Sequence, residues 1–425
     1  MNIVILLGVV VGTMALGAPI AYALGFAGLA VLLIDGSTPL FIMVQRMVAS
    51  MDSFTMLAVP LYIFIGQIMN EGGITERIFS FAKCLVGHFK GGLAHVNVLC
   101  SFIFAGMSGS ALADTAGLGQ IEVDAMRKEG FPDGFSGAVT AVTATIGPII
   151  PPSIPLVLYG GLAEVSIGRL FMAGILPGIL MAAGFSAMIV YLSHKRGYPV
   201  SDRATVSQTW KAFVRAIPAL MVVVIIIGGI LGGIFTPTEA AGVAAFYSVV
   251  IAFIMGGLTW KRLVKNLLDT AILSGAVLLI MSTSTLFAWL VTLEKIPELV
   301  ANTLLTISSN QYFILAVINI VLIIMGMFID GNSILAITVP IFVPIAEMLG
   351  VDLVQFGMMM VLNVMVGTIT PPFAMCYFSV SKICKIRYEE IVREGWNFYV
   401  PLLILLVLIT VVPALSLTLP NLIFG

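Results

Sequence analysis

The chain has 425 residues, of which 60% are hydrophobic and only 10% are charged, and its mean hydropathy is +1.13. Soluble domains carry about 25% charged residues, so this composition excludes a cytosolic enzyme, a secreted domain and a disordered chain, while a net charge of −1 excludes the basic surface that nucleic-acid binding needs. The composition therefore predicts an all-α integral membrane protein.

Apolar stretches that can form or contain membrane spans recur along the chain, since one span needs about 20 apolar residues. They lie at Ile3–Ile34, Phe54–Met69, Leu93–Ala125, Phe135–Ala163, Leu170–Leu192, Phe213–Phe235, Ala240–Leu258, Leu267–Leu293, Tyr312–Met348, Phe356–Val380 and Trp396–Leu419. The first stretch has no basic start, so we interpret it as a retained span and not as a cleaved signal. Because it exceeds the bilayer thickness, we expect it to tilt or to bend near Pro19.

Basic residues orient these stretches relative to the membrane. Seventeen of the 20 Lys and Arg residues gather in five clusters: Arg77/Lys83/Lys90, Arg127/Lys128, Lys195/Arg196/Arg203/Lys211/Arg215, Lys261/Arg262/Lys265 and Lys382/Lys385/Arg387/Arg393. The positive-inside rule places all five clusters in the cytoplasm. The N-terminus is then expected on the cytoplasmic side and the C-terminus on the opposite side.

Residues 91–126 differ from an ordinary pair of spans. Only 36 residues separate the cytoplasmic markers Lys90 and Arg127, and the middle of this stretch is the polar sequence Ser108-Gly109-Ser110. We predict a re-entrant helical hairpin whose tip lies at mid-membrane, where irregular backbone must face protein or a cavity. Two short tilted spans are the alternative interpretation.

The second half of the chain repeats the first half at an offset of 220 residues. Gly106-Met107 recurs as Gly326-Met327, and GPIIPPS from Gly147 recurs as GTITPPF from Gly367. A second predicted hairpin, 311–348, lies in a region nearly free of basic residues and so enters from outside. Equivalent segments of opposite orientation form an inverted-topology repeat, which is the architecture of many secondary transporters.

Each hairpin precedes a helix broken by a double proline, Pro151-Pro152 or Pro371-Pro372. Proline leaves backbone carbonyls unpaired, and a bound cation can satisfy these carbonyls in hydrocarbon. A kink that only serves helix packing is the alternative interpretation.

Polar residues lie at the same depth as the two breaks. Intramembrane carboxylates indicate function, although Asp114 could instead cap a half-helix, and the neutral polar residues could simply hold helices together. The polar residues at this depth are Ser108, Ser110, Asp114, Thr115, Thr143, Thr145, Ser153, Asp330, Asn332, Ser333, Asn363, Thr368 and Thr370.

The sequence contains no Walker A motif, no metal-ligand triad and no GxSxG elbow, so we expect neither an enzyme nor an organic cofactor. Hard oxygen ligands from carbonyls and hydroxyls suit Na⁺. Because no Lys or Arg is predicted in the core, an anionic substrate would meet helix N-termini and bound cations. These features favour a cation-coupled anion carrier driven by an ion gradient; a membrane enzyme is the alternative from another class.

Four motifs connect the chain to a known family: SGSALAD from Ser108, GPIIPPS from Gly147, TPTEA from Thr236 and GTITPPF from Gly367. With them the chain resembles, over essentially its whole length, the large (M-type, DctM-like) membrane subunit of tripartite ATP-independent periplasmic (TRAP) transporters. The resemblance implies a multi-pass protein of the bacterial inner membrane and an elevator-type transporter, in which a mobile transport domain holds both hairpins.

The resemblance also implies a substrate class and partners. It implies sodium-driven uptake of a carboxylate (a C4-dicarboxylate, sialic acid or another sugar acid) that a periplasmic substrate-binding protein delivers. A small four-helix membrane subunit is expected as a separate partner, since the chain begins at the large subunit's first helix. The alternative function is a stand-alone sodium/dicarboxylate symporter that needs no binding protein.

About two sodium sites follow from the same resemblance. The first is carried over to Ser108, Ser110, Gly147, Ile150 and Pro152, and the second to Gly326, Gly367 and Thr370. Because the second tip reads GMFIDGN where the first has a serine pair, the second site would depend more on backbone oxygens. The residues assigned to substrate binding and transport are Asp114, Ser153, Asp330 and Asn332.

Four segments are expected along the chain. Scaffold helices and a first interfacial arm occupy 1–90, and the first transport half occupies 91–193. Further scaffold helices and a second arm occupy 194–310, and the second transport half occupies 311–425. An apolar stripe from Ile78 to Phe89 and a weaker one from Leu299 to Ile307 predict the two arms.

Overall fold

The computed structural model describes residues 2–36, 38–71 and 73–425, and within these ranges the only regular structure is helical. The helices of the first half are α1 Asn2–Ala15, α2 Ile20–Asp35, α3 Phe41–Met51, α4 Ala58–Glu71, α5 Ile74–Val86, α6 Gly92–Ser108, α7 Ala111–Gly117, α8 Gly119–Lys128, α9 Asp133–Thr143, α10 Ile154–Leu162 and α11 Ile167–Arg196. Those of the second half are α12 Val206–Val223, α13 Gly229–Leu231, α14 Pro237–Ile254, α15 Trp260–Leu293, α16 Ile296–Ile307, α17 Gln311–Gly326, α18 Gly331–Met348, α19 Leu353–Ile369, α20 Met375–Cys384, α21 Tyr388–Val411 and α22 Ala414–Phe424. The predicted all-α class is confirmed.

Long apolar helices dominate the fold. Among the described residues, six helices are long and apolar enough to cross a membrane, and up to eight if each of two bent pairs counts as one span. The bends are 58° between Phe41–Met51 and Phe54–Asn70, and 120° between α16 and α17. This pattern agrees with a multi-pass membrane protein.

The first apolar stretch differs from its predicted form. The break falls near Pro19 as expected, but α1 and α2 are two helices of 14 and 16 residues that pack against each other, so the prediction of one bent crossing is wrong. At a rise of about 1.5 Å per residue each is roughly 21–24 Å long, shorter than a hydrocarbon core of about 30 Å. The stretch at Trp396–Leu419 is also divided, because α21 ends at Val411 before Pro413.

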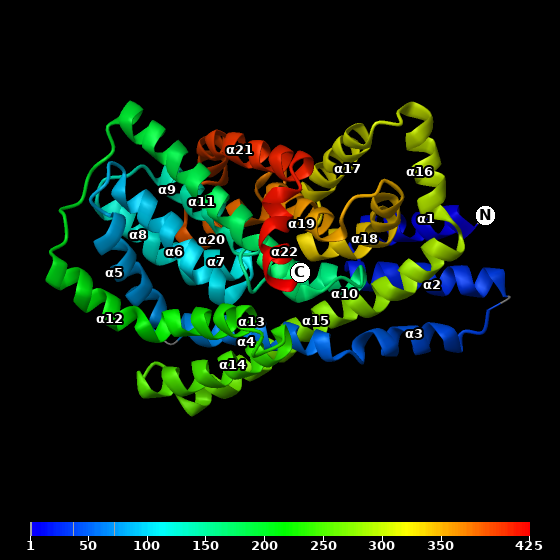
Figure 1. Ribbon diagram of the computed structural model, residues 1–425, viewed down its shortest axis with the longest axis horizontal. Coiled ribbons are helices and arrows are strands. Elements are labelled where there is room, and N and C mark those ends of the chain that lie inside the picture. The colour runs from blue at the N-terminus through cyan, green and yellow to red at the C-terminus, as the bar shows by residue number, and fades with distance from the viewer. Residues whose placement is uncertain (1, 37, 72) are drawn as a thin grey trace.

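Two layers of helices are visible in Figure 1. Helices α2, α3, α4, α12, α14 and α15 run along the lower edge of the view, while α6 to α9, α11 and α17 to α21 lie above them. The predicted arms connect the layers at opposite ends, α5 on the left and α16 on the right. Helix α5 packs against α6 and α12, and α16 packs against α18.

The two arms bury different amounts of their predicted apolar stripes. In α5, Ile78 and Ala82 are fully buried, whereas Phe89 just beyond the helix is exposed. In α16 the buried residues are Ile296, Pro297 and Ala301, while Leu299 of the predicted stripe is 57% exposed. The second arm therefore packs partly through its predicted stripe, since Val300 and Leu304 contact the core, and partly through the neighbouring Pro297 and Ala301.

The order of elements in the first half recurs in the second. A hairpin of α6 with α7 and α8, a broken helix of α9 and α10, and the long helix α11 correspond to α17 with α18, α19 with α20, and α21. The first hairpin lies on the left of Figure 1 and the second on the right. Sequence similarity at the 220-residue offset thus has a structural counterpart.

Candidate functional site

The two hairpin tips and the two proline breaks meet around one small cavity of about 90 Å³. Five pairs of its lining residues are 220 positions apart: Ser110 with Asp330, Ala111 with Gly331, Leu112 with Asn332, Pro148 with Thr368, and Pro155 with Met375. The offset found in the sequence therefore relates the two walls of the cavity, and each half of the chain supplies one wall.

Four helices begin at this cavity, and each contributes its first residues to the lining. They are α7 with Ser110 and Ala111, α10 with Ile154 and Pro155, α18 with Asp330 and Gly331, and α20 with Met375. The N-terminus of a helix carries unpaired amide groups and partial positive charge. The described lining residues include one carboxylate and no Lys or Arg, so helix ends supply the electropositive groups that an anion would meet here.

Helix C-termini lie beside the same breaks. Helix α6 ends at Ser108, the 3₁₀ turn after α9 ends at Ile146, α17 ends at Gly326 and α19 ends at Ile369. The last carbonyls of a helix lack intrahelical partners and carry partial negative charge. The arrangement therefore offers carbonyl oxygens to a cation within the same region that offers amide groups to an anion.

Several of the residues assigned to the first sodium site lie close together. A Cβ added at Gly109 would lie 2.4 Å from the carbonyl oxygen of Pro152, and one added at Gly147 would lie 3.5 Å from the carbonyl oxygen of Ser110. The Ser108 side chain is 2% exposed and its hydroxyl has no hydrogen-bond partner. A buried hydroxyl usually has a partner, so the Ser108 oxygen is an available ligand.

The second set is also brought together, mainly through backbone. A Cβ added at Gly326 would lie 2.7 Å from the Cα of Gly367, so the ends of α17 and α19 are in direct backbone contact. The hydroxyl of Thr370 donates to the carbonyl of Val366 at 2.7 Å, which leaves its oxygen lone pairs for another partner.

Matching hydrogen bonds join each hairpin tip to its proline break. The amide of Ile154 donates to the carbonyl of Gly109 at 3.4 Å, and the amide of Phe373 donates to the carbonyl of Met327 at 3.4 Å. The two bonds are offset by one or two residues from exact repeat positions, but each holds a hairpin tip against its broken helix.

Asp330 serves as the N-cap of α18. Its carboxylate accepts hydrogen bonds from the amides of Asn332 and Ser333 at 3.1 and 3.2 Å, and from the Ser333 hydroxyl. The side-chain carbonyl oxygen of the neighbouring Asn332 is buried without a partner. Both residues line the cavity, so the structure places them where they can contact a bound ion or substrate.

Asp114 and Ser153 do not line the cavity. Asp114 is 1% exposed and neither of its carboxylate oxygens has a hydrogen-bond partner. The cap of α7 is Ser110, so the alternative role of Asp114 as a helix cap is wrong. Ser153 is the N-cap of α10. Its hydroxyl donates to the Pro148 carbonyl and accepts from the Leu156 amide, so Ser153 has a structural role as a helix cap.

Two of the polar residues predicted at this depth, Thr143 and Asn363, hold helices together. The Asn97 amide donates to Thr140, and the Thr143 hydroxyl donates to the Asn97 carbonyl oxygen, both at 2.6 Å. In the other half, the Asn363 amide donates to the Asn319 side chain at 2.7 Å. Such bonds stabilise helix pairs in membranes, and here they join the first helix of each hairpin to the adjacent broken helix.

Most lining residues are absent from the sequence-based assignment, among them Met365, Met375 and Cys376. Applying the 220-residue offset to Pro155 would have identified Met375. Met365 and Cys376 have no counterpart in the lining from the first half, and apolar side chains in apolar helices give no signal of their own.

Comparison with known proteins agrees with the motifs. The family model described as "Tripartite ATP-independent periplasmic transporter, DctM component" matches residues 7–415. The chain is 42% identical over 415 residues to the sialic acid TRAP transporter large permease protein SiaM of Vibrio cholerae, covering 97% of both chains. It is 40% identical over 410 residues to the sialic acid TRAP transporter permease protein SiaT of Haemophilus influenzae, covering 96% of this chain and 67% of the relative.

One solved structure shares the fold. The Alcanivorax borkumensis YdaH transporter matches with a TM-score of 0.62 and 13% identity, covering 87% of this chain and 88% of that one. At this identity the likeness concerns the fold alone.

Proposed function

Since the chain belongs to the DctM-component family of tripartite ATP-independent periplasmic transporters, we propose that it is the permease subunit through which Na⁺ drives the import of an organic carboxylate. The observation that carries this proposal is the cavity at which four helices begin, lined by equivalent residues of both halves. Anionic groups bind favourably at helix N-termini, and discontinuous helices are the usual ion and substrate sites of secondary transporters.

The coupling ions would bind beside the cavity at two related sites. The first would use Ser108, Ser110 and the carbonyls of Gly147, Ile150 and Pro152. The second would use Gly326, Gly367 and Thr370. Asp330 and Asn332 face the cavity between them and would contact substrate or ion, and the buried carboxylate of Asp114 would contribute from behind the first tip. Sialic acid is the first substrate to test, because SiaM and SiaT are named for it.

The mechanism we propose is an elevator movement of the inverted hairpins. Ligand pockets usually enclose about 300–1,000 Å³, so a cavity of about 90 Å³ is too small for a carboxylate substrate and must open for transport. Residues 91–193 and 311–425 would form the moving domain, and 1–90 and 194–310 the scaffold with its arms. Both hairpins would re-enter from opposite faces of a bacterial inner membrane, with the C-terminus periplasmic. Because α1 and α2 pack as a pair and are not one crossing, the N-terminus would lie on the periplasmic side and not on the predicted cytoplasmic side.

Two partners complete this proposal: a small four-helix membrane subunit and a periplasmic substrate-binding protein. The test is uptake of radiolabelled sialic acid, a C4-dicarboxylate and another sugar acid into proteoliposomes, with each partner present or omitted and with or without an inward Na⁺ gradient. Uptake that needs Na⁺ and both partners is expected. Uptake by this chain alone would favour a stand-alone symporter, and uptake unaffected by Na⁺ would refute sodium coupling.

Replacing Ser110 by alanine is expected to raise the Na⁺ concentration for half-maximal uptake about fivefold, since one hydrogen-bond-sized interaction is worth about 1 kcal/mol. Ser166→Ala is the matched control, because Ser110 and Ser166 each cap a helix by accepting one amide hydrogen bond at 3.4 Å. Titrating Na⁺ against uptake for both variants separates the effects. Identical Na⁺ titrations for Ser110→Ala and Ser166→Ala would remove Ser110 from the site.

The proposed movement requires the first hairpin tip to slide along α4. A Cβ added at Gly66 of α4 would lie 3.3 Å from the Cα of Ser108. A leucine at position 66 would therefore clash with the hairpin tip and block its movement along α4, and it is expected to lower uptake at least about tenfold. Gly12→Leu is the control, since nothing lies within 4 Å of a Cβ at Gly12. Uptake by Gly66→Leu equal to that of the control, at equal membrane insertion, would argue against this sliding contact.

A further inference from the structure

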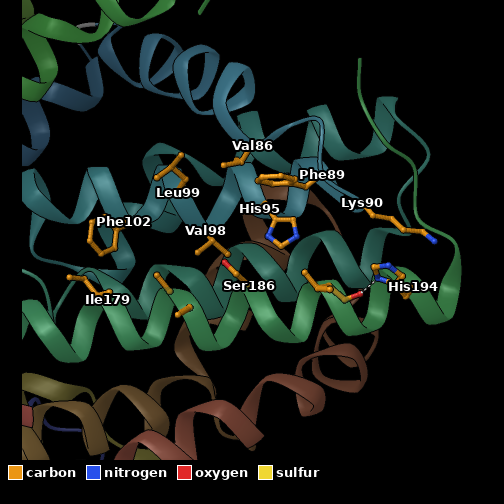
Figure 2. A pocket seen from close by; sticks show the side chains of 13 residues that line it. Val86, Phe89, Lys90, His95, Val98, Leu99, Phe102, Ile179, Ser186 and His194 are labelled. Atoms are coloured by element: carbon orange, nitrogen blue, oxygen red, sulfur yellow. Dashed lines mark hydrogen bonds between the residues drawn. The ribbon is translucent and has the colours of Figure 1, made fainter. Parts of the chain in front are cut away.

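A second, larger cavity of about 680 Å³ lies away from the transport site, where α5 ends and α6 runs beside α11. Figure 2 shows it as a groove between α6 above and α11 below, with Phe89 and Lys90 near one end and Phe102 and Ile179 near the other. Nothing in the proposed transport cycle uses this groove.

Helical periodicity explains why the groove exists. On α6 its lining residues include His95, Leu99 and Phe102, which share one face of the helix. On α11 the small residues Ala182, Ala183 and Ser186 stand opposite, and they leave space between two helices that larger side chains would fill. The interior of the groove is therefore apolar and elongated.

The groove is long enough to span one membrane leaflet. Ile179 and His194, near its two ends, are 15 residues apart on α11, or about 22 Å at a rise of about 1.5 Å per residue. One leaflet of a hydrocarbon core is about 15 Å thick. A helix about 10 Å across and equally long would occupy on the order of 1,700 Å³, so the cavity is too small for a partner helix and suits an acyl chain.

The polar groups gather at one end. Lys90, His95 and His194 line that end, and none of the described lining residues is acidic. The His95 side chain is only 7% exposed and its Nε2 atom is buried without a hydrogen-bond partner. Figure 2 shows the His95 ring inside the groove, between Phe89 and Ser186. A buried polar atom without a partner is costly, and a phosphate oxygen in the groove would accept a hydrogen bond from Nε2 when this nitrogen carries the proton.

We propose that this groove binds an anionic phospholipid of the cytoplasmic leaflet, with its headgroup phosphate held by Lys90, His95 and His194 and one acyl chain lying between α6 and α11. The inference depends on the membrane placement of the chain and is independent of its coupling ion and substrate. Because Lys90 lies at the junction of arm α5 and hairpin helix α6, the lipid would contact both proposed domains.

The test is native mass spectrometry of the purified full-length chain incubated with equimolar phosphatidylglycerol and phosphatidylcholine of identical acyl chains. The wild type is expected to retain phosphatidylglycerol at least fivefold over phosphatidylcholine. A cationic side chain near an anionic headgroup is worth about a fivefold change in binding, so Lys90→Gln with His194→Gln is expected to abolish the preference. Lys128→Gln, an exposed lysine outside the groove, is the matched control and should keep it.

A second variant tests the acyl-chain part of the groove. Ala182→Phe is expected to reduce retention of both lipids, and inorganic phosphate at millimolar concentration is expected not to displace phosphatidylglycerol. Equal retention of the two lipids by the wild type, an unchanged preference in the double variant, or loss of preference in Lys128→Gln would overturn the proposal. Displacement by inorganic phosphate would also overturn it, since that result indicates a soluble-anion site.

Discussion

Replacing Gly367 by valine is expected to lower uptake about a hundredfold. A Cβ at this position would lie 2.5 Å from the Cα of Gly326 and 2.9 Å from its carbonyl carbon. Both atoms belong to backbone and cannot rotate away as a side chain can, so α17 and α19 must separate. Overpacking of this kind costs about 1–3 kcal/mol, and here it acts where the second cation site is proposed.

The measurement for Gly367→Val is the initial rate of substrate uptake per inserted protein molecule. Gly12→Val is the matched control, because the same change in α1 meets no atom within 4 Å. Wild-type uptake by Gly367→Val would show that the contact between the two helix ends has no role in transport.

Asp330→Asn is expected to lower uptake about ten- to a hundredfold, while the fold is retained. Asparagine is as good an N-cap as aspartate, so α18 keeps its first amides bonded and only the negative charge facing the cavity is lost. A hydrogen bond to a charged group is worth about 1.5–3 kcal/mol, which corresponds to the expected change.

Glu390→Gln is the control for the loss of a carboxylate. Glu390 pairs with the exposed Arg387 three residues away, and such surface pairs contribute little. Uptake should therefore stay near the wild-type rate in Glu390→Gln. Equal activity of the two variants would remove Asp330 from the transport site.

Much of the candidate site could be predicted because the repeat is visible in the residues themselves. The offset from Gly147 to Gly367 also relates Ser110 to Asp330 and Pro155 to Met375, which line one cavity. Proline pairs cannot continue a helix, so the breaks between α9 and α10 and between α19 and α20 were readable from sequence. Long-range packing then places the four segments together.

Other features depend on packing that sequence patterns do not reveal. The first apolar stretch has no charge to mark a surface, so nothing distinguishes one bent span from the packed pair α1 and α2. The role of Ser153 was equally hidden, because a serine after two prolines can bind an ion or cap the next helix, and only the bond that it accepts from the Leu156 amide shows that it caps. Helix α3 was missed because Gln45 and Arg46 interrupt its apolar pattern.

The proposed transport site depends on two inverted hairpins whose tips meet in mid-membrane. Cysteine labelling with a membrane-impermeant maleimide tests this arrangement most directly, in a background without Cys84, Cys100, Cys376 and Cys384. We expect Lys128→Cys to react only from the cytoplasm, Ser309→Cys only from the periplasm, and Ser108→Cys from neither side. Free reaction of Ser108→Cys from the periplasm would make the first hairpin an ordinary pair of spans and would contradict the account.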